Sequence, residues 1–402
     1  MKFNLKETIS EDAGLPVIKV IGLGGGGSNA VDYMVRSEVE GVGFVCANTD
    51  LQALRNSNVD TCIQLGKNGL GAGANPEKGK EFALENIEEV KEALKGADMV
   101  FITAGMGGGT GTGSAPIVAE AARELGILTV GIVSKPFSFE RRDKVSDAGI
   151  EELAKHVDSL ITVPNDKLLK VLGKDFVLAK AFDYANEVLH GAVQGISELV
   201  TRPGLINVDF EDLRTVMTER GIAMMGVGHA TGEDRALKAA EKAIANPLLE
   251  DISVSGARGL LVNITSGLDF TLGEFNEVGE VINQVASEDA RVIIGTSIDA
   301  TMTDEIRVTV VATGLPSSVG SKNNKSTMVK PNLRAVEASK AEEKDEIEEV
   351  LESTSPVARE KTTIKEPEVI RPKVVVNGGA SSIVGSGTNY LDIPSFLRKQ
   401  AD

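Results

Sequence analysis

Two glycine-rich segments carry the clearest chemistry in the sequence. The first, residues 22–29, reads GLGGGGSN and fits the spacing G-x-G-x-x-G. Glycines allow positive φ angles and let a phosphate approach the backbone N–H groups, and the start of a following helix favours an anion. The segment therefore predicts a phosphate-binding turn between a strand and a helix. The candidate contacts in this turn are Gly24, Gly25, Gly26, Gly27 and Asn29.

Asp50 supports a rival interpretation, a dinucleotide-binding enzyme. It follows Gly27 by 23 residues and comes just after a predicted second strand. Dinucleotide-binding folds place a ribose-binding acid at this position. The first 50 residues alone therefore support an NAD(P)-dependent oxidoreductase about as well as they support a GTPase.

The second glycine-rich segment favours a polyphosphate over a dinucleotide. Residues 105–113 read GMGGGTGTG, with six glycines in nine residues, after a predicted strand and before a predicted helix. The pyrophosphate of a dinucleotide needs one glycine loop, whereas two such loops suit a longer and more highly charged polyphosphate. The sequence GxxxxGK[ST] is absent, so a P-loop NTPase is not predicted. The candidate contacts here are Gly107, Gly108, Gly109, Thr110, Gly111, Thr112 and Gly113.

Alternating apolar runs and helical patterns position both glycine loops. Strands are predicted at 17–22, 43–47, 99–103, 128–133 and 159–163. Helices are predicted between them, including 76–94 and 114–125. This alternation predicts a parallel sheet covered on both faces. Apolar residues at helical spacing over 176–201 predict a central helix of about 37 Å, at 1.5 Å per residue.

A smaller α/β or α+β activation domain is predicted after the central helix. Its strands are expected at 222–227, 259–265, 291–298 and 307–313, and its helices at 234–245 and 272–286. After residue 315 the chain is rich in Lys, Glu and Ser and cannot bury enough apolar surface to fold alone. The predicted α/β chain thus has a nucleotide-binding domain (1–175), a central helix (176–202), a catalytic-loop and C-terminal domain (203–315), a disordered linker (316–386) and a partner-binding tail (387–402).

The composition of the whole chain excludes some partners. The 402 residues carry a formal net charge of −17, and the sequence pI is near 4.8. This argues against broad electrostatic binding to nucleic acid, which needs a basic face. Because the sequence contains no run of about 18 apolar residues, direct insertion into a membrane is not expected.

Several motifs resemble one known family. Residues 107–113, GGGTGTG, resemble the tubulin/FtsZ signature G-G-G-T-G-[ST]-G, and similarity extends to about residue 315. Other family-like motifs are NTD at 48–50, GANP at 73–76, PNDKLL at 164–169 and NVDF at 207–210. The resemblance implies a GTP-dependent polymerising cytoskeletal protein of bacterial cell division. Such a protein is cytoplasmic, lies at the mid-cell division site and forms the division ring from head-to-tail filaments.

The resemblance also assigns residues to the nucleotide, GTP or GDP. It implies that Ala74 and Asn75 help the glycine loops surround the phosphates, and it adds Asn48 and Asp50 to the nucleotide-binding residues. The residues implied around the nucleoside are Glu140, Arg142, Asn165, Phe182 and Asn186. Arg141 is the alternative to Arg142, because the segment before them is shorter than in the family.

Two of these residues suit a guanine base by their chemistry. The ring of Phe182 can stack on a purine, although helical periodicity alone predicts a core residue there. Asn186 lies one turn later on the same helix face and offers both a donor and an acceptor.

Asn207, Asp209 and Asp212 form a second candidate centre, far from the glycine loops in sequence. Spacing alone favours a capping arrangement, with Asp209 at the N-cap of a helix and Asp212 in its first turn. The resemblance instead implies that this segment reaches the γ-phosphate of a neighbouring subunit's GTP and orients the attacking water. Mg²⁺ is expected to screen the phosphate charge. A binding module that uses GTP only as a structural ligand is a third hypothesis.

The C-terminal tail has a short amphipathic pattern, DIPSFLRK, at 392–399. Its apolar residues recur at i, i+3 and i+4, a proline suits the first helical turn, and basic residues suit the last. The resemblance implies that the tail binds membrane-associated division proteins such as FtsA and ZipA. The candidate partner-binding residues are Asp392, Ile393, Pro394, Phe396, Leu397 and Arg398.

Overall fold

The computed structural model describes residues 15–172, 176–219, 221–249 and 256–315. These residues fall within one structural unit, Met1–Asn324. The predicted linker (316–386) and the predicted tail (387–402), with its candidate residues from Asp392 to Arg398, lie outside the described residues.

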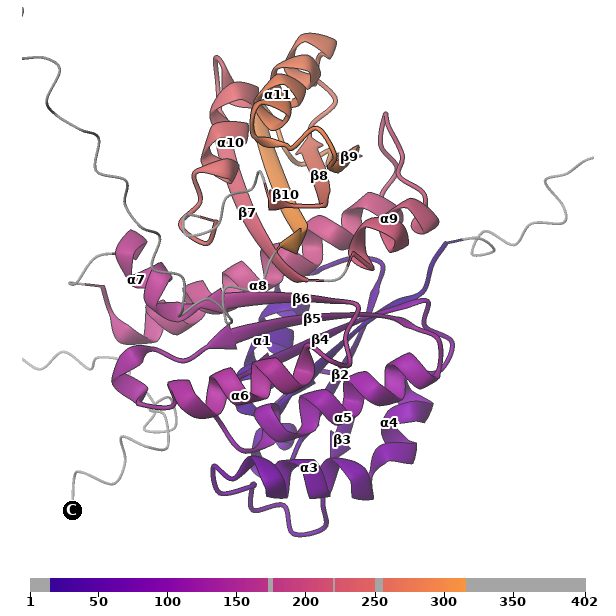
Figure 1. The fold of residues 1–402 in the computed structure, drawn as a ribbon, viewed down its shortest axis with the longest axis vertical. Helices are drawn as coiled ribbons and strands as arrows, with labels where there is room; N and C mark the ends of the chain where they lie inside the picture. Colours follow the sequence, from indigo (N-terminus) through magenta and orange to yellow (C-terminus); the bar gives the residue numbers. More distant parts are fainter. Residues whose placement is uncertain (1–14, 173–175, 220, 250–255, 316–402) are drawn as a thin grey trace, which may run out of the picture. The chain divides into compact units, whose positions relative to one another are not determined.

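Six parallel strands form the part of the sheet that carries the glycine loops (Figure 1). They are β1 (Ile18–Leu23), β2 (Val42–Asn48), β3 (Thr61–Gln64), β4 (Met99–Gly105), β5 (Leu128–Lys135) and β6 (Ser159–Pro164). Their order across the sheet is β3-β2-β1-β4-β5-β6. The direction of winding reverses between β1 and β4, which opens a crevice at the carboxyl ends of these strands. Both glycine loops begin at this crevice, because Leu23 of β1 lies opposite Ala104 of β4.

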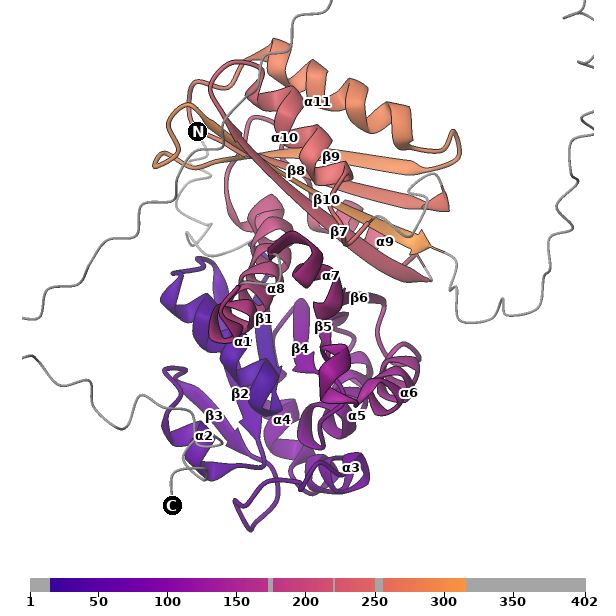
Figure 2. The ribbon, with the colours of Figure 1, turned by 90° about the vertical axis from the view of Figure 1, so that its left-hand side faces the viewer.

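Helices cover both faces of these strands. They are α1 (Gly24–Arg36), α2 (Leu51–Arg55), α3 (Pro76–Glu85), α4 (Ile87–Leu94), α5 (Thr110–Glu124), α6 (Asp143–Leu153) and α7 (Asn165–Leu172). Val20 and Phe101 belong to a buried cluster with α1, and the alternate residues Ile21 and Ile102 belong to a buried cluster with α5. Figure 2 shows α1 and α5 on either side of the strands. The predicted parallel sheet with both faces covered is therefore confirmed.

The sheet continues into a second lobe, the elements from α9 to β10. The central helix α8 (Leu178–Thr201) leads to α9 (Phe210–Met217), β7 (Ile222–Thr231), α10 (Arg235–Ile244), β8 (Gly259–Ser266), α11 (Leu272–Val285), β9 (Arg291–Ile298) and β10 (Glu305–Leu315). The strand order continues as β7-β10-β8-β9. β7 joins β6 through only two parallel residue pairs, and β10 runs antiparallel to both β7 and β8. The mixed α/β architecture is confirmed.

Some predicted bounds differ from the observed ones for local reasons. The helix predicted at 76–94 is two helices, α3 and α4, separated at Asn86. The side-chain oxygen of Asn86 accepts a hydrogen bond from Gly66 N–H at 2.8 Å, which ties this break to the end of β3. The helix predicted at 114–125 begins earlier, at Thr110, so the second glycine loop includes the first turn of α5.

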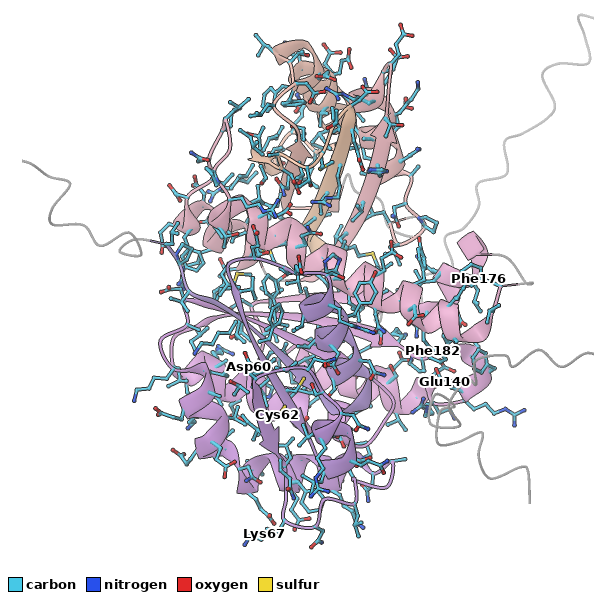
Figure 3. All side chains as sticks on the ribbon, turned by 180° about the vertical axis from the view of Figure 1, so that it is seen from behind. Asp60, Cys62, Lys67, Glu140, Phe176 and Phe182 are labelled. Carbon is cyan, nitrogen blue, oxygen red and sulfur yellow. The ribbon has the colours of Figure 1, made fainter. Side chains whose placement is uncertain are left out.

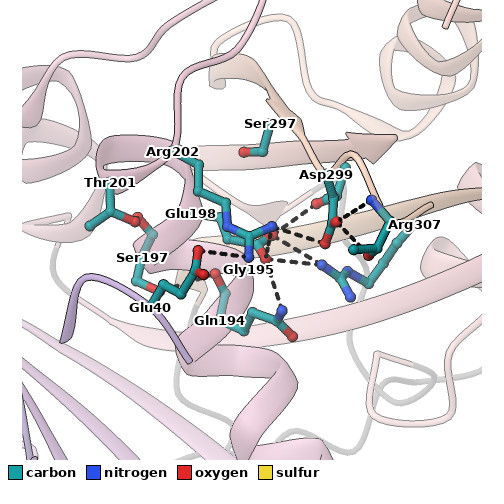
Figure 4. A network of polar contacts seen from close by, with 12 residues as sticks. Glu40, Gln194, Gly195, Ser197, Glu198, Thr201, Arg202, Ser297, Asp299 and Arg307 are labelled. Carbon is teal, nitrogen blue, oxygen red and sulfur yellow. Dashed lines mark hydrogen bonds and ion pairs between the residues drawn. The ribbon is translucent and has the colours of Figure 1, made fainter. Parts of the chain in front are cut away.

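Polar contacts hold the carboxyl-terminal end of α8 in place (Figure 4). Glu198 is buried, and both of its carboxylate oxygens accept hydrogen bonds from Arg307 of β10 at 3.1 Å. One turn later, Arg202 donates to Asp299 at 2.9 Å and to Glu40 at 3.2 Å. Burial raises the pKa of Asp299, but hydrogen bonds from Thr301 and Arg202 outweigh it and lower this pKa to about 2. The end of α8 is thus tied both to the second lobe and to the segment before β2.

Candidate functional site

A cavity of about 400 Å³ lies where the two glycine loops meet the amino-terminal half of α8. Residues from α1, α5, the end of β5 and α8 form its wall. The cavity brings together these predicted residues: Gly25, Gly26, Asn29, Gly108, Gly109, Thr110, Gly111, Glu140, Arg142, Asn165, Phe182 and Asn186. Residues that are 160 positions apart in sequence therefore line one cavity.

The amino-terminal ends of three helices, where the helix dipole is positive, face this cavity. α1 begins at Gly24, α5 at Thr110 and α7 at Asn165, and each helix contributes lining residues from its first turn. The unpaired N–H groups of a first turn and the helix dipole both favour an anion. Such a wall can hold phosphates although the chain as a whole is acidic.

Gly24 and Gly108 need to be glycine for different reasons. Gly24 has a φ of 67°, and a Cβ there would lie 2.8 Å from the backbone nitrogen of Gly111, because the two loops touch. A Cβ on Gly108 would meet only the Nη1 atom of Arg142, at 3.9 Å. A side chain at Gly108 would therefore fit the fold but extend into the space of the cavity.

Other predicted glycine-loop residues support the wall instead of lining it. A Cβ on Gly27 or Gly113 would lie within 2.4 Å of a backbone oxygen of a neighbouring element, so both permit close packing. The hydroxyl of Thr112 accepts a hydrogen bond from Gly107 N–H at 2.9 Å and shapes the loop from within.

Four predicted residues flank the second glycine loop, and three of them accept backbone N–H hydrogen bonds through a side-chain oxygen. The carboxylate of Asp50 caps α2 by accepting from Gln52 N–H at 2.8 Å, and Asn48 accepts from Asp50 N–H at 3.2 Å. Asn75 caps α3, and Ala74 before it has a φ of 57°. Because a Cβ on Gly109 would lie 2.7 Å from the backbone nitrogen of Asn75, this segment touches the loop directly.

Thr49 is a residue that sequence reasoning missed. Its hydroxyl lies 2.6 Å from the hydroxyl of Thr110, and it is almost fully buried. This contact joins the end of β2 to the first residue of α5. Thr49 stands between two predicted residues in the NTD motif, so its motif position was the available signal.

The wall opposite the glycine loops carries the ring of Phe182 and the side-chain amides of Asn165 and Asn186. Phe182 is 41% exposed, so the core position that periodicity predicts is wrong. Its ring meets Phe137 edge-on at 5.3 Å, and Figure 3 shows Phe182 and Glu140 near each other. Asn165 is 5% exposed, and its side-chain oxygen accepts no hydrogen bond from the described part of the chain. A buried acceptor without a donor is unfavourable, and a ligand hydroxyl in the cavity would satisfy it.

Arg142, and not Arg141, lies on the cavity wall. Its guanidinium forms an ion pair with Glu140, whose other carboxylate oxygen accepts from Phe137 N–H at 2.9 Å. Arg141 has a φ of 55° and forms the turn between the two. Arg142 is therefore held at the cavity by a partner that also belongs to the wall.

The acidic segment, which we define as residues 205–212, lies at the other end of α8. Asn186 lines the cavity, and the last residue of α8, Thr201, is 15 positions further along. At 1.5 Å per residue this places the end of the helix about 22 Å from Asn186. Figure 1 shows α7 and α9 at opposite ends of α8. The structure therefore does not bring Asn207, Asp209 and Asp212 to the cavity of the same chain.

The polar side chains of the acidic segment adopt the capping arrangement expected from spacing. Asp209 is the N-cap of α9, and its carboxylate accepts from Asp212 N–H at 2.7 Å. The side-chain oxygen of Asn207 accepts from Gly204 N–H at 2.8 Å. Asp212 contributes its backbone to this cap, which leaves its exposed carboxylate available.

Comparison with known proteins shows the family. Residues 17–173 match the model of the GTPase domain of the tubulin/FtsZ family, and residues 221–316 match that of the FtsZ family C-terminal domain. The chain is 53% identical to the cell division protein FtsZ of Pseudomonas aeruginosa over 412 residues, which cover 100% of both chains. The chain belongs to the tubulin/FtsZ family. It is also 59% identical to the FtsZ of Coxiella burnetii over 323 residues, covering 79% of this chain and 83% of the relative.

A solved structure of the tubulin/FtsZ family supports the same assignment. An empty FtsZ dimer of M. jannaschii has a TM-score of 0.71 and 43% sequence identity, covering 74% of this chain and 88% of that one. The chain is accordingly a GTPase of the bacterial cell-division cytoskeleton. The oxidoreductase alternative, which rested on the first glycine loop and Asp50, has no support, and Asp50 caps a helix.

A larger cavity of about 650 Å³ lies beside the middle of α8 in this family member. Its lining comes from α8, β7 and α10 and includes His190. Burial, and secondarily the charge of Arg307, lowers the pKa of His190 to about 4, so its imidazole is neutral near pH 7. Of the two cavities, the smaller one has the helix N-termini and the glycine backbone that suit phosphates.

The described residues contain neither a metal-binding cluster nor a membrane-spanning helix. Among them, no cluster of three or more His, Cys, Asp or Glu side chains is placed to hold a metal ion. The helices of that part of the chain are also too short or too polar to cross a bilayer.

Proposed function

We propose that each subunit binds GTP in the 400 Å³ cavity and hydrolyses it only when a second copy docks its acidic segment against the γ-phosphate. The observation that carries this proposal is the separation along α8. The cavity and the segment from Asn207 to Asp212 lie at opposite ends of one helix, so one chain cannot bring both to the same phosphate. A head-to-tail pair brings the two halves together.

On the subunit that holds GTP, the glycine loops and the three helix N-termini bind the phosphates through backbone N–H groups. Phe182 stacks on the guanine, and Asn186 pairs with the base edge. Asn165 accepts a hydrogen bond from a ribose hydroxyl, which satisfies its buried oxygen. Arg142, held by Glu140, adds the positive charge of its side chain.

On the neighbouring subunit, Asp212 and Asp209 orient the attacking water, and Asn207 assists them. Their proposed task is to hold the water in line for attack, so the position of these carboxylates matters more than their basicity. Mg²⁺ is proposed to bind mainly through phosphate oxygens and water, since Asp50 caps a helix and Glu140 is paired. The ion would stabilise charge that develops on the transferred phosphoryl group.

Exposed apolar side chains near both ends of α8 support a head-to-tail contact. Leu70 is 89% exposed beside Asp50, with which it forms a β-bridge. Leu205 lies in the acidic segment, and Leu268 and Leu272 follow β8, whose last residue pairs with the end of β9. Contacts between two different faces of identical subunits generate open filaments when the rotation does not close a ring.

The tail and the location complete the proposal on sequence grounds. We infer that residues 392–399 bind membrane-associated division proteins such as FtsA and ZipA, which would hold cytoplasmic filaments at mid-cell. Ordering a short peptide opposes binding, so single tails bind weakly and many tails along one filament bind together. Deletion of residues 392–402 should leave GTP hydrolysis unchanged and abolish binding to these partners; retained binding would contradict this role.

Gly108→Ser is expected to lower GTP affinity by at least about tenfold, because the new side chain occupies space that the phosphates need. The fold should tolerate the change, since a Cβ there meets only the end of a flexible arginine. Equilibrium binding of GTP, with NAD as a competitor, measures the effect.

Gly279→Ser on α11 is the matched control, because a Cβ at that position has no neighbour within 4 Å and α11 belongs to the second lobe. Its GTP affinity should equal that of the unchanged protein. Unchanged affinity in Gly108→Ser would remove the second glycine loop from the binding site.

A further inference from the structure

The segment that follows α8 lies along the outer edge of β9. β9 is the last strand of the sheet, and β8 occupies its inner edge. Thr296 N–H donates to Ile206 O at 3.0 Å, and Ile298 N–H donates to Pro203 O at 3.3 Å. These alternate N–H groups would otherwise form an unpaired strand edge. The segment 203–206 therefore takes its position from the sheet of the second lobe.

Thr296 holds this segment with its side chain as well as its backbone. Its hydroxyl oxygen accepts a hydrogen bond from Ile206 N–H at 2.8 Å, so both backbone polar groups of Ile206 bind one residue. Thr296 is 4% exposed, which protects these bonds from water. The fit is close, because a Cβ on Gly204 would lie 1.6 Å from the carbonyl oxygen of Thr296.

The contact at Ile206 comes one residue before Asn207 and three before Asp209. Beyond it the chain is held at each step: Asn207 bonds back to Gly204, Val208 is buried, and Asp209 caps α9. The side chains of Leu205 and Ile206 are exposed and pack little against their own subunit. Backbone hydrogen bonds, and not side-chain packing, therefore set where this part of the acidic segment lies.

We propose that Thr296 is a positioning residue for GTP hydrolysis. Its hydroxyl fixes Ile206 so that Asn207, Asp209 and Asp212 meet the neighbouring subunit's γ-phosphate in a reactive geometry. This inference rests on the proposed function, in which the acidic segment acts across the subunit contact. Thr296 touches neither nucleotide nor water and acts only through the segment.

The test compares Thr296→Val with Thr296→Ser in the full-length protein. Valine keeps the shape but removes the acceptor of Ile206 N–H, whereas serine keeps the hydroxyl. We expect Thr296→Val to lower kcat per assembled subunit about tenfold, as loss of one positioning hydrogen bond in a buried setting does. The dissociation constant for GTP should not change, because the cavity lies at the other end of α8. Thr296→Ser should restore most of kcat.

A control separates positioning from general loss of stability. The hydroxyl of Thr129 on β5 is fully buried and donates to Ile127 O at 2.9 Å, away from the acidic segment. Thr129→Val should lower the thermal midpoint without lowering kcat, whereas Thr296→Val should lower kcat at temperatures where it is fully folded.

Two results would overturn the proposal: an unchanged kcat in Thr296→Val, or an equal loss of kcat in Thr296→Ser. Failure of the proposed function looks different. In that case Asp212→Ala would itself hydrolyse GTP normally, so its activity, measured alongside, tells the two failures apart.

Discussion

Asp212→Ala is expected to lower GTP hydrolysis per assembled subunit by about 100-fold or more, the usual range for a group that positions a reactant or moves a proton. GTP affinity should remain unchanged, because the end of α8 lies about 18 Å from Leu189, the cavity residue of that helix nearest to it. The fold should also tolerate the change, since the cap of α9 uses the backbone of Asp212 and the carboxylate of Asp209. Filaments of the variant should persist longer, because GTP remains at their contacts.

Glu211→Ala is the matched control for Asp212→Ala. Glu211 is the adjacent acid in the same helical turn, is exposed and forms only a surface pair with Arg214 at 3.5 Å. Such pairs contribute little to stability, so this variant should hydrolyse GTP at a rate close to that of the unchanged protein. Loss of GTP affinity in Asp212→Ala would instead mean that Asp212 supports its own subunit's pocket or fold.

The strands and the glycine loops could be predicted because their signals are local. Runs such as 99–102 are continuously apolar, as strands buried on both faces are, and glycine clusters close after two of the strands indicate backbone that a ligand approaches. β3 was missed, because it has only four residues and only Ile63 in it is buried. The break at Asn86 was also missed, since its cause is a hydrogen bond to Gly66, 20 residues away.

The parts of the site that could not be predicted depend on tertiary packing. Phe182 fits the helical period whether its side of α8 faces a core or a cavity, so spacing could not distinguish the two. Ser134 and Pro136 line the cavity because β5 lies next to β4, which is a matter of strand order. Thr296 gave no signal, because a threonine is ordinary in a strand and its role comes from the segment that pairs with it.

The sequence alone also could not show that the cavity and the acidic segment lie far apart in one subunit. Asp209 and Asp212 at i and i+3 indicate a helix cap, and the structure contains that cap. Only the length and placement of α8 exclude these carboxylates from their own subunit's cavity. The proposed shared site rests on this geometry and on the resemblance to the family, and its residues remain a prediction.

Mixing two inactive variants should restore GTP hydrolysis, from near zero to a substantial fraction of normal activity. At GTP concentrations that fill the cavity of Asp212→Ala, Gly108→Ser holds little GTP but keeps an intact acidic segment, and Asp212→Ala holds GTP but lacks the carboxylate. In a head-to-tail pair the cavity of Asp212→Ala meets the acidic segment of Gly108→Ser. In an equal mixture about a quarter of randomly formed contacts join the two competent halves.

This mixing measurement tests the shared site most directly. Phosphate release is followed at a GTP concentration that fills Asp212→Ala but lies below the dissociation constant of Gly108→Ser. It is measured for each variant alone, for the mixture, and for Asp212→Ala mixed with the double variant Gly108→Ser/Asp212→Ala, while sedimentation verifies that the partners co-assemble. The shared site predicts activity only in the mixture of the two single variants. A mixture that co-assembles but releases no more phosphate than its separate components would contradict it, because the catalytic carboxylate would then have to act within its own subunit.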